Sequence, residues 1–253
     1  ADFQLLAPSF TVSLQPWQEQ LLFLRLMYKS TFRMPTFNDL YYYRLGNRSL
    51  RPEKANEYNM GITWSRSFSS FLNYLSVTVD GYYNDVTDKI VAFPTTYAWK
   101  MANYGKVHVT GMDATLAAAA SLGKNMVLVV SGGYTWQKAI DLTDATSKSY
   151  KDQLPYTPKH SGNVSAVLEM PWVNVGYSIV GVSERYSMSQ NIPENRIDGY
   201  MEHTASLSRN FSFRHCKLRL QAEIINMTDT QYDVIKYYPM PGRSWRLTGT
   251  IEF

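Results

Sequence analysis

The side chains best suited to hold a ligand gather in one segment of this 253-residue chain, between residues 31 and 54. Arginine guanidinium groups and tyrosine rings are combined there, which suits an anionic, aromatic or polycyclic ligand. The same side chains could instead anchor the chain at an interface and pair with carboxylates nearby. The candidate ligand-binding residues are Arg33, Tyr41, Tyr42, Tyr43, Arg44, Asn47 and Arg48.

Covalent catalysis has little support in this sequence. The chain contains no G-x-S-x-G elbow, no H-E-x-x-H and no phosphate-binding loop. We therefore expect a protein that is not an enzyme and needs no cofactor. The single Cys216 excludes an internal disulfide framework and offers no thiolate metal site.

Composition narrows the class of protein further. The net charge is +4, but the basic residues are scattered and form no nucleic-acid-binding motif, so we expect no nucleic-acid partner. Aromatic residues make up 14% of the chain and include 19 Tyr, which tolerate one end in lipid and the other in water. No apolar run approaches the roughly 20 residues of a transmembrane helix. The chain is therefore soluble, or it is a β-barrel.

Apolar and polar side chains alternate with a period of two, which predicts strands throughout the chain. One set would face lipid and the other a wet lumen, where charges are tolerated. The final strand alternates in the same way and ends on the aromatic Phe253. The predicted lipid-facing sets are Leu75, Val77, Val79, Gly81 and Tyr83; Met126, Leu128, Val130, Gly132, Tyr134 and Trp136; and Leu218, Leu220, Ala222 and Ile224.

This pattern predicts an all-β fold of about eleven strands. Short turns and longer loops alternate between the strands, as in outer-membrane barrels, whereas a soluble sandwich has no reason to obey that rule. The strands are expected near 8–16, 20–30, 55–68, 73–92, 98–121, 125–142, 160–170, 173–189, 200–212, 217–235 and 244–253. The longer loops are expected at 31–54, 93–97, 143–159, 190–199 and 236–243.

Bacterial barrels made of one chain close with an even number of strands. About eleven strands would therefore leave such a barrel open. An open edge in lipid would leave backbone groups unsatisfied, so we expect missing sequence or another polypeptide to complete the barrel. No signal peptide opens the chain at Ala1, so we expect that a precursor segment was removed or that the chain is part of a longer protein. The histidines are interpreted as rim or lumen residues and not as metal ligands: His108, His160, His203 and His215.

Several motifs resemble the C-terminal half of a TonB-dependent outer-membrane transporter. The segment FRMPTFNDLYY at 32–42 is similar to the family's "FRAP…LY", and GNRSLRPE at 46–53 to its "GNPNLKPE". NYGK at 103–106 with GMD at 111–113 resembles "N-x-G…G-x-E", with Asp113 in place of the commoner Glu. LPYTPKH at 154–160, INMTDTQY at 225–232 and YPMPGR at 238–243 complete the likeness.

The resemblance implies that residues 1–253 are the C-terminal half of a 22-stranded transmembrane barrel. The N-terminal barrel half and a plug domain, which contacts the energising protein TonB, would lie upstream of Ala1. It implies a receptor in the outer membrane of a Gram-negative bacterium, surrounded by lipid. It also implies that the barrel-assembly machinery reads Phe253 as an assembly signal.

The resemblance further implies import of a scarce small-molecule ligand. Haem receptors of the family carry a ligating His between the first two motifs, and residues 36–46 contain none. A ferric siderophore, another iron chelate or cobalamin is therefore expected. The alternatives are a passive outer-membrane porin, which would conduct without a ligand, and a soluble all-β binding module, which would purify without detergent.

Overall fold

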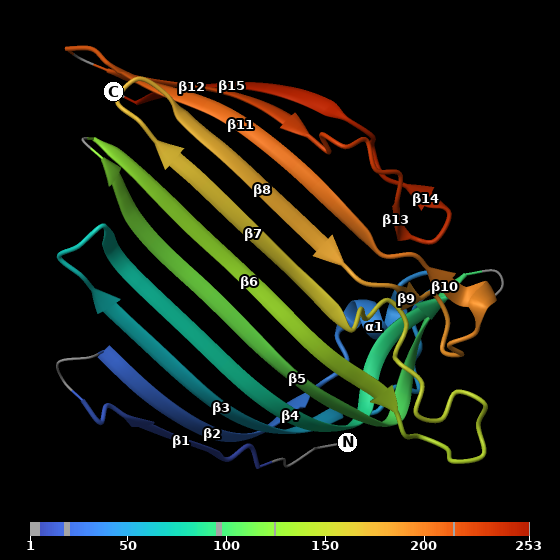
Figure 1. The fold of residues 1–253 in the computed structure, drawn as a ribbon. Helices are drawn as coiled ribbons and strands as arrows, with labels where there is room; N and C mark the ends of the chain where they lie inside the picture. Colours follow the sequence, from blue (N-terminus) through green and yellow to red (C-terminus); the bar gives the residue numbers. More distant parts are fainter. Residues whose placement is uncertain (1–5, 18–20, 95–97, 124, 215, 253) are drawn as a thin grey trace.

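A computed structural model describes residues 6–17, 21–94, 98–123, 125–214 and 216–252. Its main element is one antiparallel sheet of eleven strands, each paired with its neighbour along the chain (Figure 1). The predicted all-β fold of about eleven strands is confirmed. The strands are β1 (Ser9–Leu14), β2 (Leu21–Arg33), β3 (Glu53–Ser67), β4 (Leu72–Pro94), β5 (Trp99–Gly123), β6 (Met126–Asp141), β7 (His160–Glu169), β8 (Asn174–Val182), β11 (Tyr200–Ser212), β12 (Lys217–Ile225) and β15 (Ser244–Glu252).

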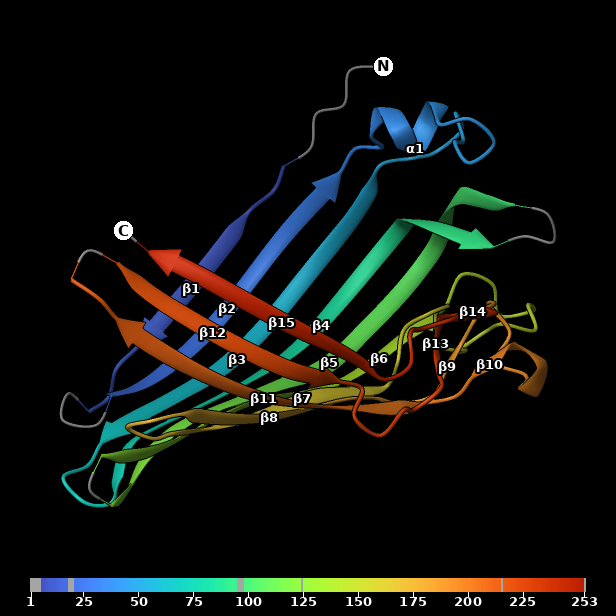
Figure 2. The ribbon, with the colours of Figure 1, turned by 90° about the horizontal axis from the view of Figure 1, so that it is seen from above.

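The sheet curves around an axis, so it has a convex and a concave face. In Figure 1 the middle strands β7 and β8 lie nearest the viewer, and Figure 2 shows the first and last strands curving away behind them. Helix α1 (Phe37–Tyr41) lies on the concave side, near the ends of β4 and β5. No helix of the described residues is long and apolar enough to cross a membrane.

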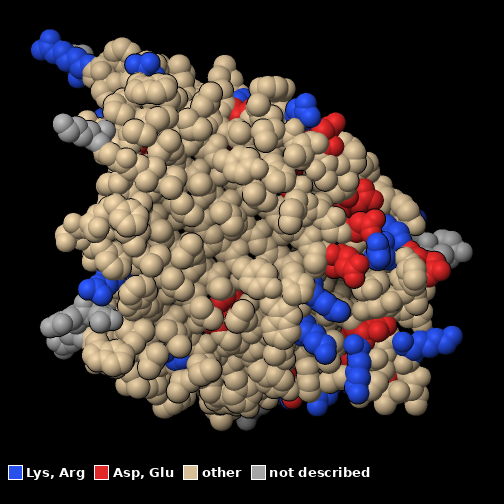
Figure 3. All heavy atoms as spheres, in the orientation of Figure 1, with Lys and Arg blue, Asp and Glu red and all other residues tan. Residues whose placement is uncertain are grey.

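The convex face is largely uncharged. Figure 3, which views this face, shows few charged atoms over the middle of the sheet and many more toward the end with the long loops. The pairing register places Val79 beside Ile62 of β3 and Ala114 of β5, so apolar residues of adjacent strands share this face. The lipid-facing sets predicted from alternation all lie on it, because side chains change face at each residue.

The concave face carries the charges that alternation assigned to a lumen. Arg25 forms an ion pair with Asp80 at 2.8 Å, and the pair spans Gly61, which lies between them in the register. A Cβ atom on Gly61 would come within 2.0 Å of Asp80 Oδ1. Glycine is therefore required there for the ion pair to cross β3.

Aromatic side chains and histidines pair on the convex face. The ring nitrogens of His108, His160 and His203 each hydrogen-bond a tyrosine hydroxyl of the preceding strand: Tyr83 at 3.3 Å, Tyr134 at 2.7 Å and Tyr177 at 2.7 Å. The interpretation as lumen residues is wrong for these three, since each shares the face of its apolar-stripe tyrosine. His215 lies outside the described residues.

Two predicted strands end earlier than expected. The strand predicted at 173–189 stops at Val182, and the loop after it holds the two-residue strands β9 (Arg185–Tyr186) and β10 (Arg196–Ile197) with the short helix η1 (Pro193–Asn195). The strand predicted at 217–235 stops at Ile225, because Asn226 adopts φ 51° and its side chain caps Thr230. A separate hairpin follows, formed by β13 (Asp233–Ile235) and β14 (Tyr238–Pro239).

Candidate functional site

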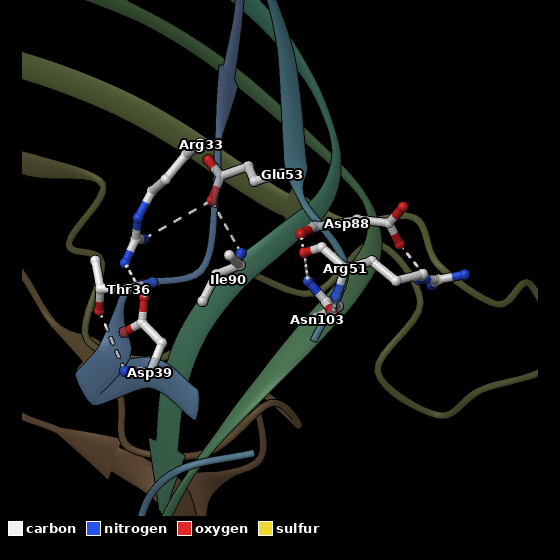
Figure 4. A network of polar contacts seen from close by, with 8 residues as sticks. All are labelled: Arg33, Thr36, Asp39, Arg51, Glu53, Asp88, Ile90 and Asn103. Carbon is white, nitrogen blue, oxygen red and sulfur yellow. Dashed lines mark hydrogen bonds and ion pairs between the residues drawn. The ribbon is translucent and has the colours of Figure 1, made fainter. Parts of the chain in front are cut away.

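The first long loop begins with a short helix that its own sequence caps. The Thr36 hydroxyl accepts from the Asp39 N–H at 3.2 Å, and the Asp39 carboxylate accepts from the Thr36 N–H at 2.9 Å, which is a capping box. Arg33 Nη2 also donates to Asp39 Oδ2 at 2.8 Å (Figure 4). Burial raises the pKa of Asp39, but the Thr36 hydrogen bonds and the Arg33 charge lower it more, so its net pKa lies below the ordinary value.

The rest of the loop is fixed to the concave side of the β4–β5 hairpin. Leu50 packs with Ile90 and Met101 in a buried cluster. Asn47 Nδ2 donates to the Met101 carbonyl at 3.0 Å, and the Met101 N–H donates to the Leu45 carbonyl at 2.9 Å. These contacts hold the loop at the mouth of the curved sheet.

A second set of polar contacts secures the end of this loop. Asn103 Oδ1 accepts from the Arg51 N–H at 2.9 Å, and its Nδ2 group donates to the carbonyls of Arg51 and Asp88 (Figure 4). Glu53 Oε2 accepts from the Ile90 N–H at 2.9 Å. Asn103 belongs to the N-Y-G-K motif of the sequence, so that motif joins the loop to the hairpin.

Five of the seven candidate residues form an exposed cluster. The Arg48 guanidinium lies 5.1 Å from the centre of the Tyr41 ring, and the Arg44 guanidinium lies 5.2 Å from that of Tyr43. Tyr42 is 59% exposed and Tyr43 79%. No ion pair of the described residues involves Arg44 or Arg48, so both cations are available to an anionic ligand. We call Tyr41, Tyr42, Tyr43, Arg44 and Arg48 the rim cluster.

The other two candidates have structural partners. Arg33 pairs with Asp39 and lies 4.0 Å from Glu53, and Asn47 bonds to the backbone of Met101. The structure thus places six of the seven residues between β2 and β3 and Arg33 at the end of β2, and it divides the seven into two groups. Both partners of Arg33 lie within 20 positions of it, whereas Met101 lies 54 residues from Asn47.

Sequence reasoning did not single out a second group of residues at the same end of the sheet. The rings of Tyr200 and Tyr232 stack with their centres 3.9 Å apart, and the Tyr232 hydroxyl donates to Glu202 at 2.5 Å. Burial and the Glu202 carboxylate raise the pKa of Tyr232, so its hydroxyl stays protonated. A cavity of about 300 Å³ next to this stack is lined by Arg196, Asp198, Tyr232, Asp233, Lys236 and Tyr237.

The buried Arg185 organises the same region. Its guanidinium donates to the carbonyls of Asp233 at 2.6 Å and Val234 at 3.0 Å, and it faces the Tyr200 ring at 5.8 Å. It therefore ties the β13–β14 hairpin to the loop after β8. The sequence signals nearby are the motifs at 225–232 and 238–243, which identify family segments but give no partner across the fold.

A family model described as TonB dependent receptor-like, beta-barrel matches residues 2–227. The vitamin B12 transporter BtuB of Photobacterium profundum is 25% identical over 230 residues, which are 88% of this chain and 34% of that protein. BtuB of Vibrio vulnificus is 26% identical over 231 residues, 88% of this chain and 33% of that protein. The chain spans about a third of the length of these relatives.

Solved structures share the fold at lower sequence identity. The ferric citrate transporter FecA in its unliganded form aligns with a TM-score of 0.74 and 16% identity, over 96% of this chain and 37% of that one. The copper transporter OprC aligns with a TM-score of 0.72 and 14% identity, over 96% of this chain and 38% of that one. The ferric-catecholate import receptor Fiu of E. coli K12, in its closed form, aligns with a TM-score of 0.68 and 20% identity, over 95% of this chain and 34% of that one.

Proposed function

Because this chain belongs to the TonB dependent receptor-like β-barrel family, a family of transporters and receptors and not of enzymes, we propose that it is part of an active-transport receptor. Residues 1–253 form the C-terminal part of its transmembrane barrel, in the outer membrane of a Gram-negative bacterium. The observation that carries this proposal is the open eleven-stranded sheet, whose convex face is apolar and whose concave face is charged.

The rest of the receptor follows from the two edges of the sheet. β1 and β15 each pair with one neighbour in this sheet, so each offers a free row of backbone groups. Such groups need partners in a bilayer, and the N-terminal half of a 22-stranded barrel supplies them. The plug domain fills the concave side and contacts TonB.

The ligand is a scarce, bulky molecule that the rim cluster binds from outside. Two free guanidinium groups beside exposed tyrosine rings favour an anionic iron chelate, such as a ferric siderophore. Cobalamin is the second candidate, because the curated relatives are vitamin B12 transporters.

The test measures transport by the full-length receptor in cells. Radiolabelled ferric citrate, a ferric catecholate and cobalamin are offered with and without functional TonB. We expect saturable uptake of one of them that disappears without TonB, and no steady ion conductance in a planar bilayer. Conductance without ligand, together with uptake that survives the loss of TonB, would show a passive porin instead.

A further inference from the structure

Three lysines on the convex face have no anionic partner. Lys54 of β3, Lys106 of β5 and Lys138 of β6 are exposed, and none belongs to an ion pair of the described residues. The register places Lys54 and Lys106 on either side of Thr87, in one row across three strands. Their backbones are therefore about 10 Å apart, within reach of one shared anion.

One carboxylate on this part of the face lies beside a histidine. Asp85 lies two residues before Thr87 on the same face, and its Oδ1 atom is 3.2 Å from His108 Nε2. This single carboxylate offsets at most one of the two lysine charges. The positive charge of Lys54 and Lys106 is available to a molecule that lies against the convex face.

The lysines lie just beyond the tyrosines toward the long loops. Lys54 is four residues from Tyr58, and Lys138 is four residues from Tyr134, or about 13 Å along a strand. Tyrosines on an apolar barrel face mark the membrane interface, and long lysine side chains near them reach the headgroup layer. The lysines are thus at the depth of lipid headgroups.

An apolar groove opens on the other side of the same tyrosines. It encloses about 420 Å³, and its convex lining includes Leu26, Met60, Tyr58 and Tyr83 around Gly81. Gly81 leaves the floor open, since the nearest atom to a Cβ built there is 4.0 Å away. Along the strands the groove is followed by the tyrosines, then by the row of Asn56, Asp85 and His108, and then by the lysine pair.

We propose that the convex face of β2–β5 binds a phosphorylated lipid of the outer leaflet. An acyl chain occupies the Gly81 groove, the rings of Tyr58 and Tyr83 cover the ester region, and Lys54 and Lys106 share the phosphate. This inference rests on the proposed function, in which the convex face lies in the membrane. A lipid fits better than a free anion because the cationic and apolar parts of the site lie on the same face of the same strands.

The test uses full-length receptor in detergent and native mass spectrometry. Phosphatidic acid is compared with diacylglycerol of the same acyl chains, which lacks only the phosphate. We expect retention of phosphatidic acid to fall about tenfold in the double variant Lys54→Gln/Lys106→Gln, and retention of diacylglycerol to stay the same. Equal retention of phosphatidic acid by the native and variant receptors overturns the proposal.

Two further variants separate the parts of the site. Lys29→Gln/Lys148→Gln removes the same charge from the concave face and from the loop after β6, and should leave phosphatidic acid binding unchanged. Gly81→Val fills the groove and should weaken retention of both lipids. Equal losses in the two lysine double variants would show a net-charge effect and overturn the site.

The outcome is independent of the transport test. A receptor that imports its ligand with TonB, but binds phosphatidic acid equally in all variants, refutes the lipid site and leaves the proposed function intact. A protein that conducts passively refutes the transport proposal, and the lysine variants still decide the lipid site because a porin also exposes its convex face to lipid.

Discussion

At the scale of single residues, Arg33 at the end of β2 and Arg48 in the following loop differ in whether their charges are paired. Arg33 is held by Asp39 and lies near Glu53, so its charge is already compensated. Arg48 lies over the Tyr41 ring and has no carboxylate partner in the described chain. A ligand that replaces water at Arg48 therefore gains a charge contact at little cost to the fold.

The first prediction concerns affinity. Arg44→Gln combined with Arg48→Gln removes both free cations of the rim cluster. We expect the full-length receptor to bind its imported ligand at least about tenfold more weakly if that ligand is anionic, and with less dependence on salt. Equilibrium binding of the radiolabelled ligand measures this.

The control for that variant is Arg66→Gln. Arg66 lies on β3 near the short turn to β4 and faces the Phe68 ring, at the opposite end of the strand from the rim cluster. Arg66→Gln should leave the affinity for the imported ligand unchanged. Unaltered affinity in the rim variant itself would remove Arg44 and Arg48 from the site.

The second prediction compares two glycines in one β3–β4 pair. Gly61→Val should destabilise the barrel by about 1–3 kcal/mol, because its side chain would collide with Asp80 and part the Arg25 ion pair. The valine side chain of Gly81→Val would point to open space on the convex face, so this substitution should leave the free energy of unfolding nearly unchanged. Urea unfolding of the full-length receptor in detergent gives both values, and equal losses would contradict the assigned faces.

At the scale of elements, periodicity predicted the strands of the main sheet because a two-residue alternation is a local signal. It could not place the end of β12, where buried Asn226 turns the backbone and binds Thr230 and Pro241. It also missed α1, whose five residues are too few to show a helical period. The loop anchors join residues about 50 positions apart, which a pattern in one sequence does not reveal.

The third prediction concerns the helix cap. Thr36→Ala removes the hydroxyl that accepts from the Asp39 N–H. It should lower the free energy of opening of residues 36–47 by about 1 kcal/mol, so that their amide hydrogens exchange faster. Hydrogen exchange of the full-length receptor measures this. Thr146→Ala, which removes a hydroxyl that donates to the Asp144 carboxylate in the loop after β6, should leave residues 36–47 unaffected.

The same loop should respond to acid. The pKa of Asp39 is lower in the folded protein than its usual value of 3.8, so its contribution to stability is fully present above that value. It is lost as the pH falls through the lowered folded pKa. Exchange of residues 36–47, corrected for the intrinsic rate, should therefore be constant from pH 7 to about pH 5 and accelerate below about pH 4. Acceleration already near pH 6 would contradict this assignment.

At the scale of the whole molecule, the chain is a curved sheet with two free edges, and its two faces differ in charge. Sequence patterning predicted both properties because a barrel imposes them on every strand. The ligand could not be predicted, because alternation sets which face is wet but not what the loop side chains bind.

The fourth prediction concerns assembly and Phe253, which lies outside the described residues. Deleting it should lower the amount of folded receptor in the outer membrane, because the resemblance makes the terminal aromatic residue a signal for the assembly machinery. Ligand affinity per folded molecule should stay the same. Heat-modifiable migration on gels measures the folded fraction, and normal insertion of the deletion variant would refute the role.

The way the first long loop is attached leaves its exposed side chains free to vary. Met101, Leu45, Arg51 and Ile90 contribute main-chain atoms to the anchoring bonds; every residue type offers the carbonyl, and every type except proline offers the N–H. Only a few side chains, among them Asn47, Glu53 and Asn103, must be kept. The exposed arginines and tyrosines can then be exchanged by mutation while the loop keeps its shape, so the surface that the loop presents can change without any change to the sheet beneath it.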